Sequence, residues 1–313
     1  MTTLVYDDIY TKHDTGLQHP ENSLRITNTV TYLKSTGVWE KLGVEKPRAA
    51  TIEEIASVHS SYHIEHIEKL ARTGGGNIDP DTSVSPFSYD AASYAAGAPL
   101  TAIDLVMKGE VDNAFCLIRP PGHHATPTRA MGFCLFNNVS IAAKYLQREY
   151  NLEKVVIIDW DVHHGNGTQD TFYEDPSVLY FSIHRYPFYP GTGRESETGK
   201  GRGVGGTINI PLPHGTTSKT YISRFQTVLE KDIKQFRPNF ILISSGFDAY
   251  GLDPVGGLGL GTSAFRILTE MTQKIARECC EGRIVSCLEG GYHLSDLPRC
   301  IEEHLNGLNS TQN

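Results

Sequence analysis

Residues 155–168, VVIIDWDVHHGNGT, place acidic and imidazole side chains directly after an apolar run. The run reads as a strand buried on both faces, and ligands of open α/β sheets gather beyond the carboxyl ends of such strands. Side chains two positions apart share a face of a strand, so Asp159, Asp161 and His163 can point toward one spot. Carboxylates combined with imidazole suit a divalent ion, with zinc or ferrous iron ahead of calcium. The spacing predicts a metal site.

Two further strand ends carry matching chemistry. ILISSGFDA places Asp248 after a second buried run, and LEGGYHL places Tyr292 after the Gly290–Gly291 pair. Asp161, His163 and Asp248 would leave a tetrahedral ion one open position, which is typical of a catalytic site. Glycines allow the backbone to pass close to a ligand, so the Tyr292 hydroxyl can reach that open side.

A fourth segment, IRPPGHHATP, supplies adjacent histidines after a Pro-Pro-Gly turn. His123 and His124 can both lie in a loop above a metal. One of them can take a proton from water and return it to a leaving group if its pKa lies near neutral. The other needs a charged partner, for which Asp159 is well placed because Asp161 is committed to the ion.

Each feature also has a plainer interpretation. An isolated Asp-x-Asp can be a capped loop, and most single histidines are core or surface residues. The combination with Asp248, the histidine pair and Tyr292 favours catalysis. His164 points to the opposite face from His163 and is expected to lie behind the site. The remaining histidines that we interpret as structural or solvated are His13, His59, His63, His66, His184, His214 and His304.

Short β-branched runs alternate with longer amphipathic segments along the chain, which predicts a mostly parallel sheet between helices. The expected strands are 114–118, 155–159, 178–183, 207–210, 240–244 and 283–288. The expected helices are 52–72, 89–108, 138–150, 218–235, 263–280 and 295–308. No linker or repeat interrupts the pattern, so residues 1–313 are expected to form one domain.

Composition narrows the functional classes. The chain has 313 residues and a formal charge of -8 without a basic cluster, which argues against direct nucleic-acid binding. The six cysteines form no CxxC pair, and we find no leader and no apolar stretch long enough for a membrane span. We therefore expect reduced thiols and a cytoplasmic protein that does not bind membranes. The oligomeric state stays open, although symmetric homo-oligomers are common among soluble enzymes.

Five separated motifs together resemble the zinc-dependent histone deacetylase family, including its bacterial amidohydrolase and acetylpolyamine amidohydrolase relatives. They are HH at 123–124, GFCLFNN at 132–138, DWDVHHGNGT at 159–168, GFDA at 246–249 and EGGY at 289–292. HPENSLR at 19–25 is similar to the opening motif of the family. Asn166 and Thr168 resemble the class II branch, since class I members usually have an aspartate in place of Asn166.

The resemblance implies a role for each matching residue. The implied zinc ligands are Asp161, His163 and Asp248. The implied catalytic residues are His124 as general base and acid, His123 as its electrostatic partner held by Asp159, and Tyr292 as donor to the carbonyl oxygen. Asn166 would orient His124 without adding charge. The implied substrate-binding residues are Gly132, Phe133, Tyr189 and Gly290 along the acyl-lysine channel and Arg25 near an inner cavity for acetate.

The resemblance also implies a fold, two cofactors and a reaction. The fold would be a single-domain α/β arginase/deacetylase type, with one Zn²⁺ per chain and a structural K⁺. Potassium would be held by Asp159, Asp161, His163, Ser182 and Ile183. The expected enzyme is a zinc-dependent amidohydrolase that uses metal-activated water to hydrolyse N-acyl-lysine, in a peptide or protein, or a related acetylated small amine, releasing acetate. Alternatives are an acetylpolyamine amidohydrolase, a binuclear manganese ureohydrolase and a non-catalytic acyl-lysine binder.

Overall fold

The central sheet is built from short runs of buried aliphatic residues. In the computed structural model, which describes residues 1–310, eight strands pair in the order β2-β1-β5-β10-β9-β6-β7-β8, and every neighbouring pair is parallel. The strands are β1 (Thr2–Val5), β2 (Gly43–Glu45), β5 (Asn113–Cys116), β6 (Val155–Asp159), β7 (Val178–Arg185), β8 (Thr207–Leu212), β9 (Phe240–Ser245) and β10 (Ile284–Leu288). A separate antiparallel pair joins β3 (Gly76–Asn77) to β4 (Ser83–Val84). The predicted α/β class with a mostly parallel sheet is confirmed.

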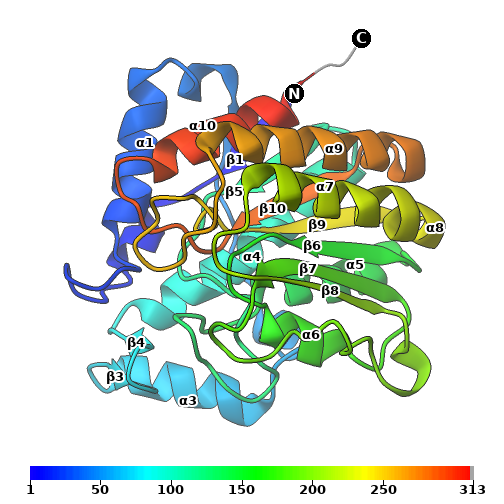
Figure 1. Cartoon of the computed structure of the whole chain (residues 1–313). Coiled ribbons are helices and arrows are strands. Elements are labelled where there is room, and N and C mark those ends of the chain that lie inside the picture. Colours follow the sequence, from blue (N-terminus) through cyan, green and yellow to red (C-terminus); the bar gives the residue numbers. More distant parts are fainter. Residues whose placement is uncertain (311–313) are drawn as a thin grey trace.

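Helices cover both faces of the sheet (Figure 1). On one face α4 packs on β5 and β10, and α5 packs on β6 and β9. On the other face α9 packs on β9 and against α10, which contacts β5 and α1. The helices are α1 (Leu24–Ser35), α2 (Ile52–Ile55), α3 (Ser61–Arg72), α4 (Ser88–Met107), α5 (Asn138–Tyr150), α6 (Asn166–Phe172), α7 (Ser218–Val228), α8 (Lys234–Phe236), α9 (Thr262–Cys280) and α10 (Leu297–Leu308). A π-helical turn at Leu229–Ile233 joins α7 to α8.

The prediction of one helix over residues 52–72 is wrong. The segment forms α2 and α3, which are separated by a turn. The break has a local cause, because the Ser60 side chain accepts a hydrogen bond from the His63 backbone N–H and starts a new helix there. The Ser60 backbone N–H donates to Pro127 O at 2.8 Å, a bond that tertiary structure supplies.

The elements that were not predicted include β1, β2, α1, α6 and the short antiparallel pair of β3 and β4. β1 and β2 contain only four and three residues, too few for periodicity to identify them. α6 begins at Asn166 within the motif HHGNGT, where Gly165 and Gly167 disfavour a helix by propensity. A Cβ at Gly167 would overlap with the backbone of His124 and Ala125, so glycine is needed there for close packing.

The sheet order brings the chemically interesting loops together. β6 lies between β9 and β7, and β10 lies beside β9, so their carboxyl ends share one edge of the sheet (Figure 1). Asp159 is in register with Ser244 of β9 and with Ser182 of β7. The loops that follow these strands therefore meet near the middle of that edge.

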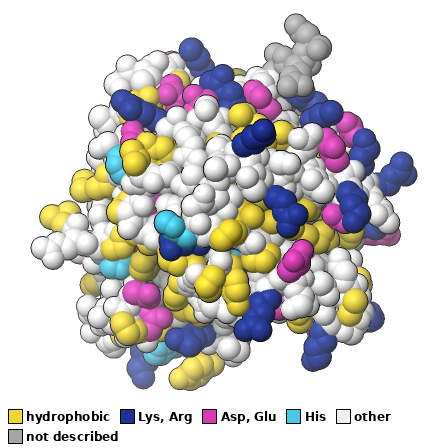
Figure 2. Space-filling view, in the orientation of Figure 1, with side chains coloured by type: hydrophobic (Ala, Val, Ile, Leu, Met, Phe, Trp, Pro, Cys, Tyr) yellow, Lys and Arg dark blue, Asp and Glu magenta, His cyan; other side chains and the backbone are white. Residues whose placement is uncertain are grey.

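The visible surface in Figure 2 mixes charged side chains of both signs around a central group of hydrophobic ones. Among residues 1–310, no helix combines the length and the apolar character that a bilayer crossing requires.

Candidate metal centre and active site

Three side chains converge at the carboxyl ends of β6 and β9. Asp161, His163 and Asp248 each offer a ligand atom, and these atoms lie within 4.8 Å of one another. His163 Nδ1 is 3.0 Å from Asp161 Oδ1 and 3.1 Å from Asp248 Oδ2. Ligand atoms about 2.0–2.1 Å from a tetrahedral zinc ion lie about 3.3 Å apart, so the geometry fits such an ion closely.

The backbone orients both carboxylates. Asp161 Oδ1 accepts the His163 N–H at 2.9 Å, and Asp161 Oδ2 accepts the Gly290 N–H at 2.8 Å. Asp248 Oδ1 accepts the Val162 N–H at 2.9 Å. A Cβ at Gly290 would overlap with both carboxylates, so the chain can pass this close only with glycine. In this orientation Asp161 Oδ1 and Asp248 Oδ2 both face the His163 ring.

The electrostatics of the group favour a cation. Burial opposes a charged His163, but hydrogen bonds to Asp161 and Asp248 outweigh burial and raise its pKa to about 9. Burial and the charge of Asp161 raise the pKa of Asp248 to about 7. Two buried carboxylates this close repel each other unless positive charge lies between them. A divalent ion bound between the three side chains would supply that charge.

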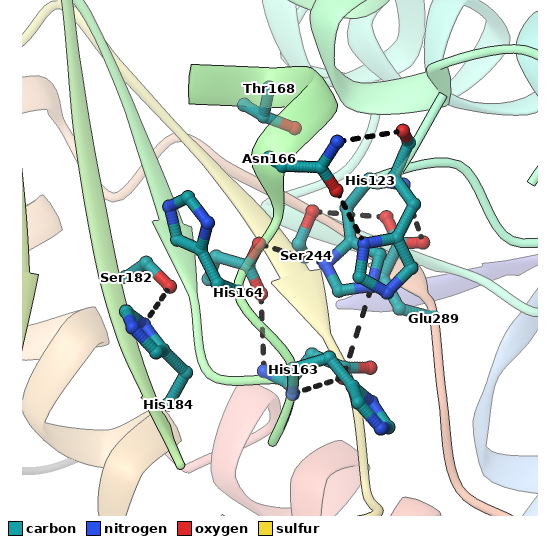
Figure 3. A network of polar contacts seen from close by, with 12 residues as sticks. His123, His163, His164, Asn166, Thr168, Ser182, His184, Ser244 and Glu289 are labelled. Carbon is teal, nitrogen blue, oxygen red and sulfur yellow. Dashed lines mark hydrogen bonds and ion pairs between the residues drawn. The ribbon is translucent and has the colours of Figure 1, made fainter. Parts of the chain in front are cut away.

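The two adjacent histidines make different contacts; His123 and Asn166 are labelled in Figure 3. His123 Nδ1 lies 3.0 Å from Asp159 Oδ2, and His124 Nδ1 lies 2.8 Å from Asn166 Oδ1. Burial opposes charging of His123, yet Asp159 and Asp161 outweigh it and raise its pKa to about 10. Burial and the charges of His123 and His163 hold the pKa of His124 well below its usual value. Near neutral pH the pair therefore combines a charged imidazole with a neutral one.

Asn166 defines the tautomer of His124. Its amide nitrogen faces His124 O at 3.4 Å, which leaves Oδ1 to accept from the ring. An amide oxygen only accepts, so His124 Nδ1 carries the hydrogen and Nε2 is left as a base.

The loop that carries the histidines is fixed by Glu289, which is labelled in Figure 3 and is fully buried. Glu289 Oε2 accepts the backbone N–H groups of Gly122 at 2.6 Å and His123 at 3.2 Å. Glu289 Oε1 accepts the Ser244 hydroxyl at 3.0 Å. This carboxylate therefore joins β9, the end of β10 and the histidine loop.

A cavity of about 230 Å³ opens above the metal-ligating group. Phe188 stacks on His163 at 5.1 Å between centroids, and the Tyr189 ring meets His124 edge-on at 5.1 Å. The Phe133 ring meets Tyr292 edge-on at 5.9 Å. The residues that line the cavity are Asp81, His124, Gly132, Phe133, His163, Phe188, Tyr189, Val255 and Tyr292.

The Gly132–Phe133 pair adopts an unusual backbone conformation. Both residues have positive φ, 56° at Gly132 and 68° at Phe133. A left-handed non-glycine residue costs on the order of 1–3 kcal/mol and persists only where its surroundings hold it. The Phe133 N–H donates to Thr82 Oγ1 at 3.2 Å, and a Cβ at Gly132 would overlap with the His124 ring. The strain presents the Phe133 ring to the cavity.

Two residues with expected substrate-binding roles lie outside this lining: Gly290, expected along the channel, and Arg25, expected near an inner cavity. Gly290 lies against the carboxylates of Asp161 and Asp248. Arg25 is fully buried behind Tyr292, with its guanidinium carbon 5.0 Å from the ring centroid. Arg25 Nε donates to Gly291 O at 2.7 Å and Nη2 donates to Glu289 O at 2.5 Å. The structure thus places Arg25 as a support of the tyrosine segment.

The residues expected to hold potassium come from the carboxyl ends of β6 and β7 and from the segment directly after β6. Asp159 and Ser182 are register partners on β6 and β7. Ser182 Oγ is 2.9 Å from His184 Nδ1, and Ile183 O accepts the Tyr221 hydroxyl at 3.3 Å. Asp161 and His163 directly follow β6.

Some residues of the site had no clear signal in the sequence. Phe188 and Val255 line the cavity without belonging to a recognised motif, although Phe188 directly precedes Tyr189. Glu21 and Arg119 are also fully buried close to the site. Arg119 follows the strand that leads to the histidine pair, which is the one feature that marks it.

Glu21 is predicted to be a major source of stability. Its Oε1 accepts from Arg25 Nη1 at 3.0 Å and its Oε2 accepts from Arg119 Nη2 at 3.0 Å. In Glu21→Gln the two buried guanidinium groups lose their counter-charge, which we expect to lower the free energy of unfolding by about 3–5 kcal/mol. Urea denaturation at pH 7 measures this, with the exposed Glu40→Gln as control. A loss equal to that of the control would contradict the prediction.

The same carboxylate predicts an acid dependence of stability. Burial raises the pKa of Glu21, but Arg119 and Arg25 outweigh burial and lower it. A lowered folded pKa stabilises the protein fully above the unfolded pKa, and this contribution is lost as pH falls through the folded value. As pH falls below about 4.5, the free energy of unfolding should therefore decrease through loss of this contribution in the wild type but not in Glu21→Gln.

Comparison with known proteins agrees with this geometry. Residues 19–308 match the family described as histone deacetylase domain. The chain is 39% identical over 294 residues to a probable deacetylase of Archaeoglobus fulgidus, covering 93% of this chain and 81% of the relative. It is 36% identical over 297 residues to a histone deacetylase-like amidohydrolase of Pseudomonas aeruginosa, covering 94% of this chain and 77% of the relative.

Solved structures show the same fold. The crystal structure of the HDA15 HD domain superimposes with a TM-score of 0.94 at 35% identity, covering 100% of this chain and 89% of that chain. The family model matches most of the chain, the two relatives are more than one third identical to it, and the metal-ligating triad lies at the expected strand ends. The chain therefore belongs to the histone deacetylase family of deacetylases and amidohydrolases.

Proposed function

We propose that the protein, acting as one domain over residues 1–313, is a zinc-dependent deacylase that hydrolyses the amide bond of N-acyl-lysine in a peptide or protein. The observation that carries this proposal is the aromatic cavity that ends beside the triad of Asp161, His163 and Asp248. Its volume of about 230 Å³ suits a thin aliphatic chain with a small amide. Sites for drug-sized ligands are larger, about 300–1,000 Å³.

The donor set supports a single zinc ion. Two carboxylates and one imidazole leave one position open, as in catalytic zinc sites. When bound, zinc supplies a Lewis acid that polarises the amide carbonyl and lowers the pKa of water toward about 7. We further propose that Asp159, Asp161, His163, Ser182 and Ile183 hold a structural potassium ion.

The residues around the cavity can perform the proton transfers. His124 lines the cavity and has Nε2 free as a base, so it accepts the proton of the attacking water and then donates it to the departing amine nitrogen. His123 carries a positive charge stabilised by Asp159 beside the reacting group. Burial and the charge of Asp248 hold the pKa of Tyr292 well above its usual value. Tyr292 therefore stays protonated and can donate a hydrogen bond to the carbonyl oxygen.

An acetylated polyamine is the second candidate substrate. Asp81 lies at the cavity and Asp79 accepts the Asp81 backbone N–H at 3.2 Å. These carboxylates can attract the distal ammonium group of such an amine. The other lining residues near the cavity mouth, such as Val255 and Tyr189, do not add a charge. An acyl-lysine within a peptide therefore remains the favoured substrate.

Two other functions fit less well. A binuclear manganese ureohydrolase needs additional bridging carboxylates, whereas the part of the chain that the structure describes contains one such triad. A non-catalytic binder would be expected to lack part of the machinery, yet His123, His124 and Tyr292 all lie at the site.

Turnover of a substrate panel by enzyme loaded with zinc tests the proposal. The panel contains an acetyl-lysine peptide, longer acyl-lysine peptides and acetylspermidine, and metal content is measured on the same sample. We expect about one zinc per chain and the highest kcat/KM on an acyl-lysine peptide. Preference for acetylspermidine would favour the second candidate, and two manganese ions per chain without amide hydrolysis would reject both.

Asn166→Asp is predicted to shift the pH dependence. The substitution places a negative charge 2.8 Å from His124 Nδ1, where the wild type has a neutral amide. A nearby carboxylate stabilises the imidazolium and raises the pKa of His124, on the order of 1–3 units. The acidic limb of kcat/KM, where the base must be neutral, should therefore move to higher pH. An acidic limb at the same pH in the wild type and in Asn166→Asp would argue against His124 as the base.

A further inference from the structure

The segment that carries Tyr292 is not part of a helix or strand. β10 ends at Leu288, and residues 289–293 have no regular secondary structure. Gly290 and Gly291 precede the tyrosine, and Gly291 has a φ of 121°. Glycine pairs allow many backbone conformations, so contacts from elsewhere must define where the Tyr292 side chain begins.

A carboxylate from a different loop binds the N–H groups of this segment. Asp253 Oδ2 accepts the backbone N–H of Tyr292 at 2.7 Å and that of His293 at 3.2 Å. Asp253 Oδ1 accepts the N–H groups of Val255 at 2.9 Å and Gly256 at 3.0 Å. The residue is 9% exposed, so four donors converge on a carboxylate that is largely withdrawn from water. Hydrogen bonds to a charged acceptor are about twice as strong as neutral ones.

Arg25 binds the carbonyl groups of the same segment. Its guanidinium donates to Glu289 O and Gly291 O, and it lies over the Tyr292 ring. The tyrosine backbone is thus held between a positive group that donates to carbonyl oxygens and a negative group that accepts from N–H groups.

The Asp253 loop is also the loop of a proposed metal ligand. It begins just after Asp248, and the Gly257 N–H donates to Asp248 O at 2.8 Å. Val255, which Asp253 orients, lines the cavity. One carboxylate therefore connects the strand end that carries Asp248 with the strand end that carries Tyr292.

We infer that Asp253 is a positioning residue, which places the Tyr292 hydroxyl relative to the metal-ligating group. This inference rests on the proposed function, in which Tyr292 donates to the carbonyl oxygen. Asp253 does not touch substrate in this role. It acts through the backbone of Tyr292, so its removal should cost turnover while the metal ligands stay intact.

A double-mutant cycle tests the inference. Asp253→Asn keeps the shape of the side chain but directs an amide NH₂ at one pair of N–H donors. We expect kcat on an acetyl-lysine peptide to fall about 10- to 100-fold, less than the 10²- to 10³-fold expected for loss of an oxyanion donor itself. KM should stay within about twofold and zinc content should be unchanged, as expected for a contact that acts mainly in the transition state. In a Tyr292→Phe background the same substitution should cost less than about twofold, because residues that act through one group are not additive.

Asp296→Asn is the matched control. Asp296 accepts the Tyr250 hydroxyl at 3.0 Å and lies 3.1 Å from His293 Nδ1, so it belongs to the same region. Its side-chain partners are Tyr250, His293 and Arg299 and not the Tyr292 backbone, so its replacement should leave kcat within about twofold.

The outcomes separate the two proposals. Wild-type kcat in Asp253→Asn, or an equal loss with and without the Tyr292 hydroxyl, would overturn the inference while leaving the proposed function intact. Full activity of Tyr292→Phe would overturn the role of Tyr292 and this inference with it. If Asp253→Asn does not fold, Asp253→Ser, whose hydroxyl still accepts one N–H, is measured in the same cycle with the same criteria.

Discussion

Asp248→Asn is expected to remove zinc from the protein and to abolish most of its activity. Asp248 supplies one of three ligand atoms, and its carboxylate contributes one of the two negative charges that favour a cation. Replacing outer partners of metal ligands usually costs about 10- to 100-fold in affinity or activity, so loss of a ligand should exceed about 100-fold. Zinc per chain after dialysis and kcat/KM at saturating zinc measure the two effects.

Asp90→Asn provides the control for Asp248. Asp90 is an exposed acid in the first turn of α4, and it belongs neither to the metal-ligating group nor to the lining of the cavity. This variant should keep one zinc per chain and full activity. If Asp248→Asn also kept one zinc and more than half of the activity, Asp248 would not be a ligand.

Tyr292→Phe is expected to lower kcat by about 10²- to 10³-fold, or roughly 3–4 kcal/mol, with KM and zinc content little changed. The substitution removes only the hydroxyl from a ring that contacts Phe133 and Arg25. The hydroxyl is needed mainly when negative charge develops on the carbonyl oxygen, so its loss affects the transition state more than substrate binding.

A second tyrosine in the cavity provides the control for Tyr292. Tyr189 is 37% exposed and meets His124 edge-on, so Tyr189→Phe keeps the wall of the cavity. Its kcat should stay within a few-fold of wild type, as for most changes of exposed groups. Equal losses in the two variants would mean that the Tyr292 hydroxyl has no special part in turnover.

The strands around the site were predictable because they are fully buried. β6 has the predicted bounds, and β9 and β10 differ from prediction by one residue each. Parallel strands covered on both faces are continuous apolar runs that end abruptly in polar residues. The strand ends that carry Asp161, Asp248 and Tyr292 could therefore be predicted from the sequence. The structure brings these residues together.

The supporting carboxylates were not predictable in the same way. Asp253 and Glu289 act on backbone N–H groups that lie 39 and 167 positions away in the sequence. Backbone groups are present at every residue, so a carboxylate that binds them has no characteristic spacing or partner type. The break between α2 and α3 was missed for a related reason, because Ser60 is fixed by Pro127 from a distant loop.

The neighbouring positions of β6, β9 and β10 determine when during biosynthesis the proposed metal site can form. His163 meets Asp248 across 85 positions, and the Gly290 N–H reaches Asp161 across 129. A nascent chain that has left the ribosome only as far as the segment after β6 holds two of the three proposed ligands, Asp161 and His163, and contacts of such long range form late in folding. Capture of the proposed zinc ion should therefore follow release of nearly the whole polypeptide, so that chains stalled during translation would not sequester the ion.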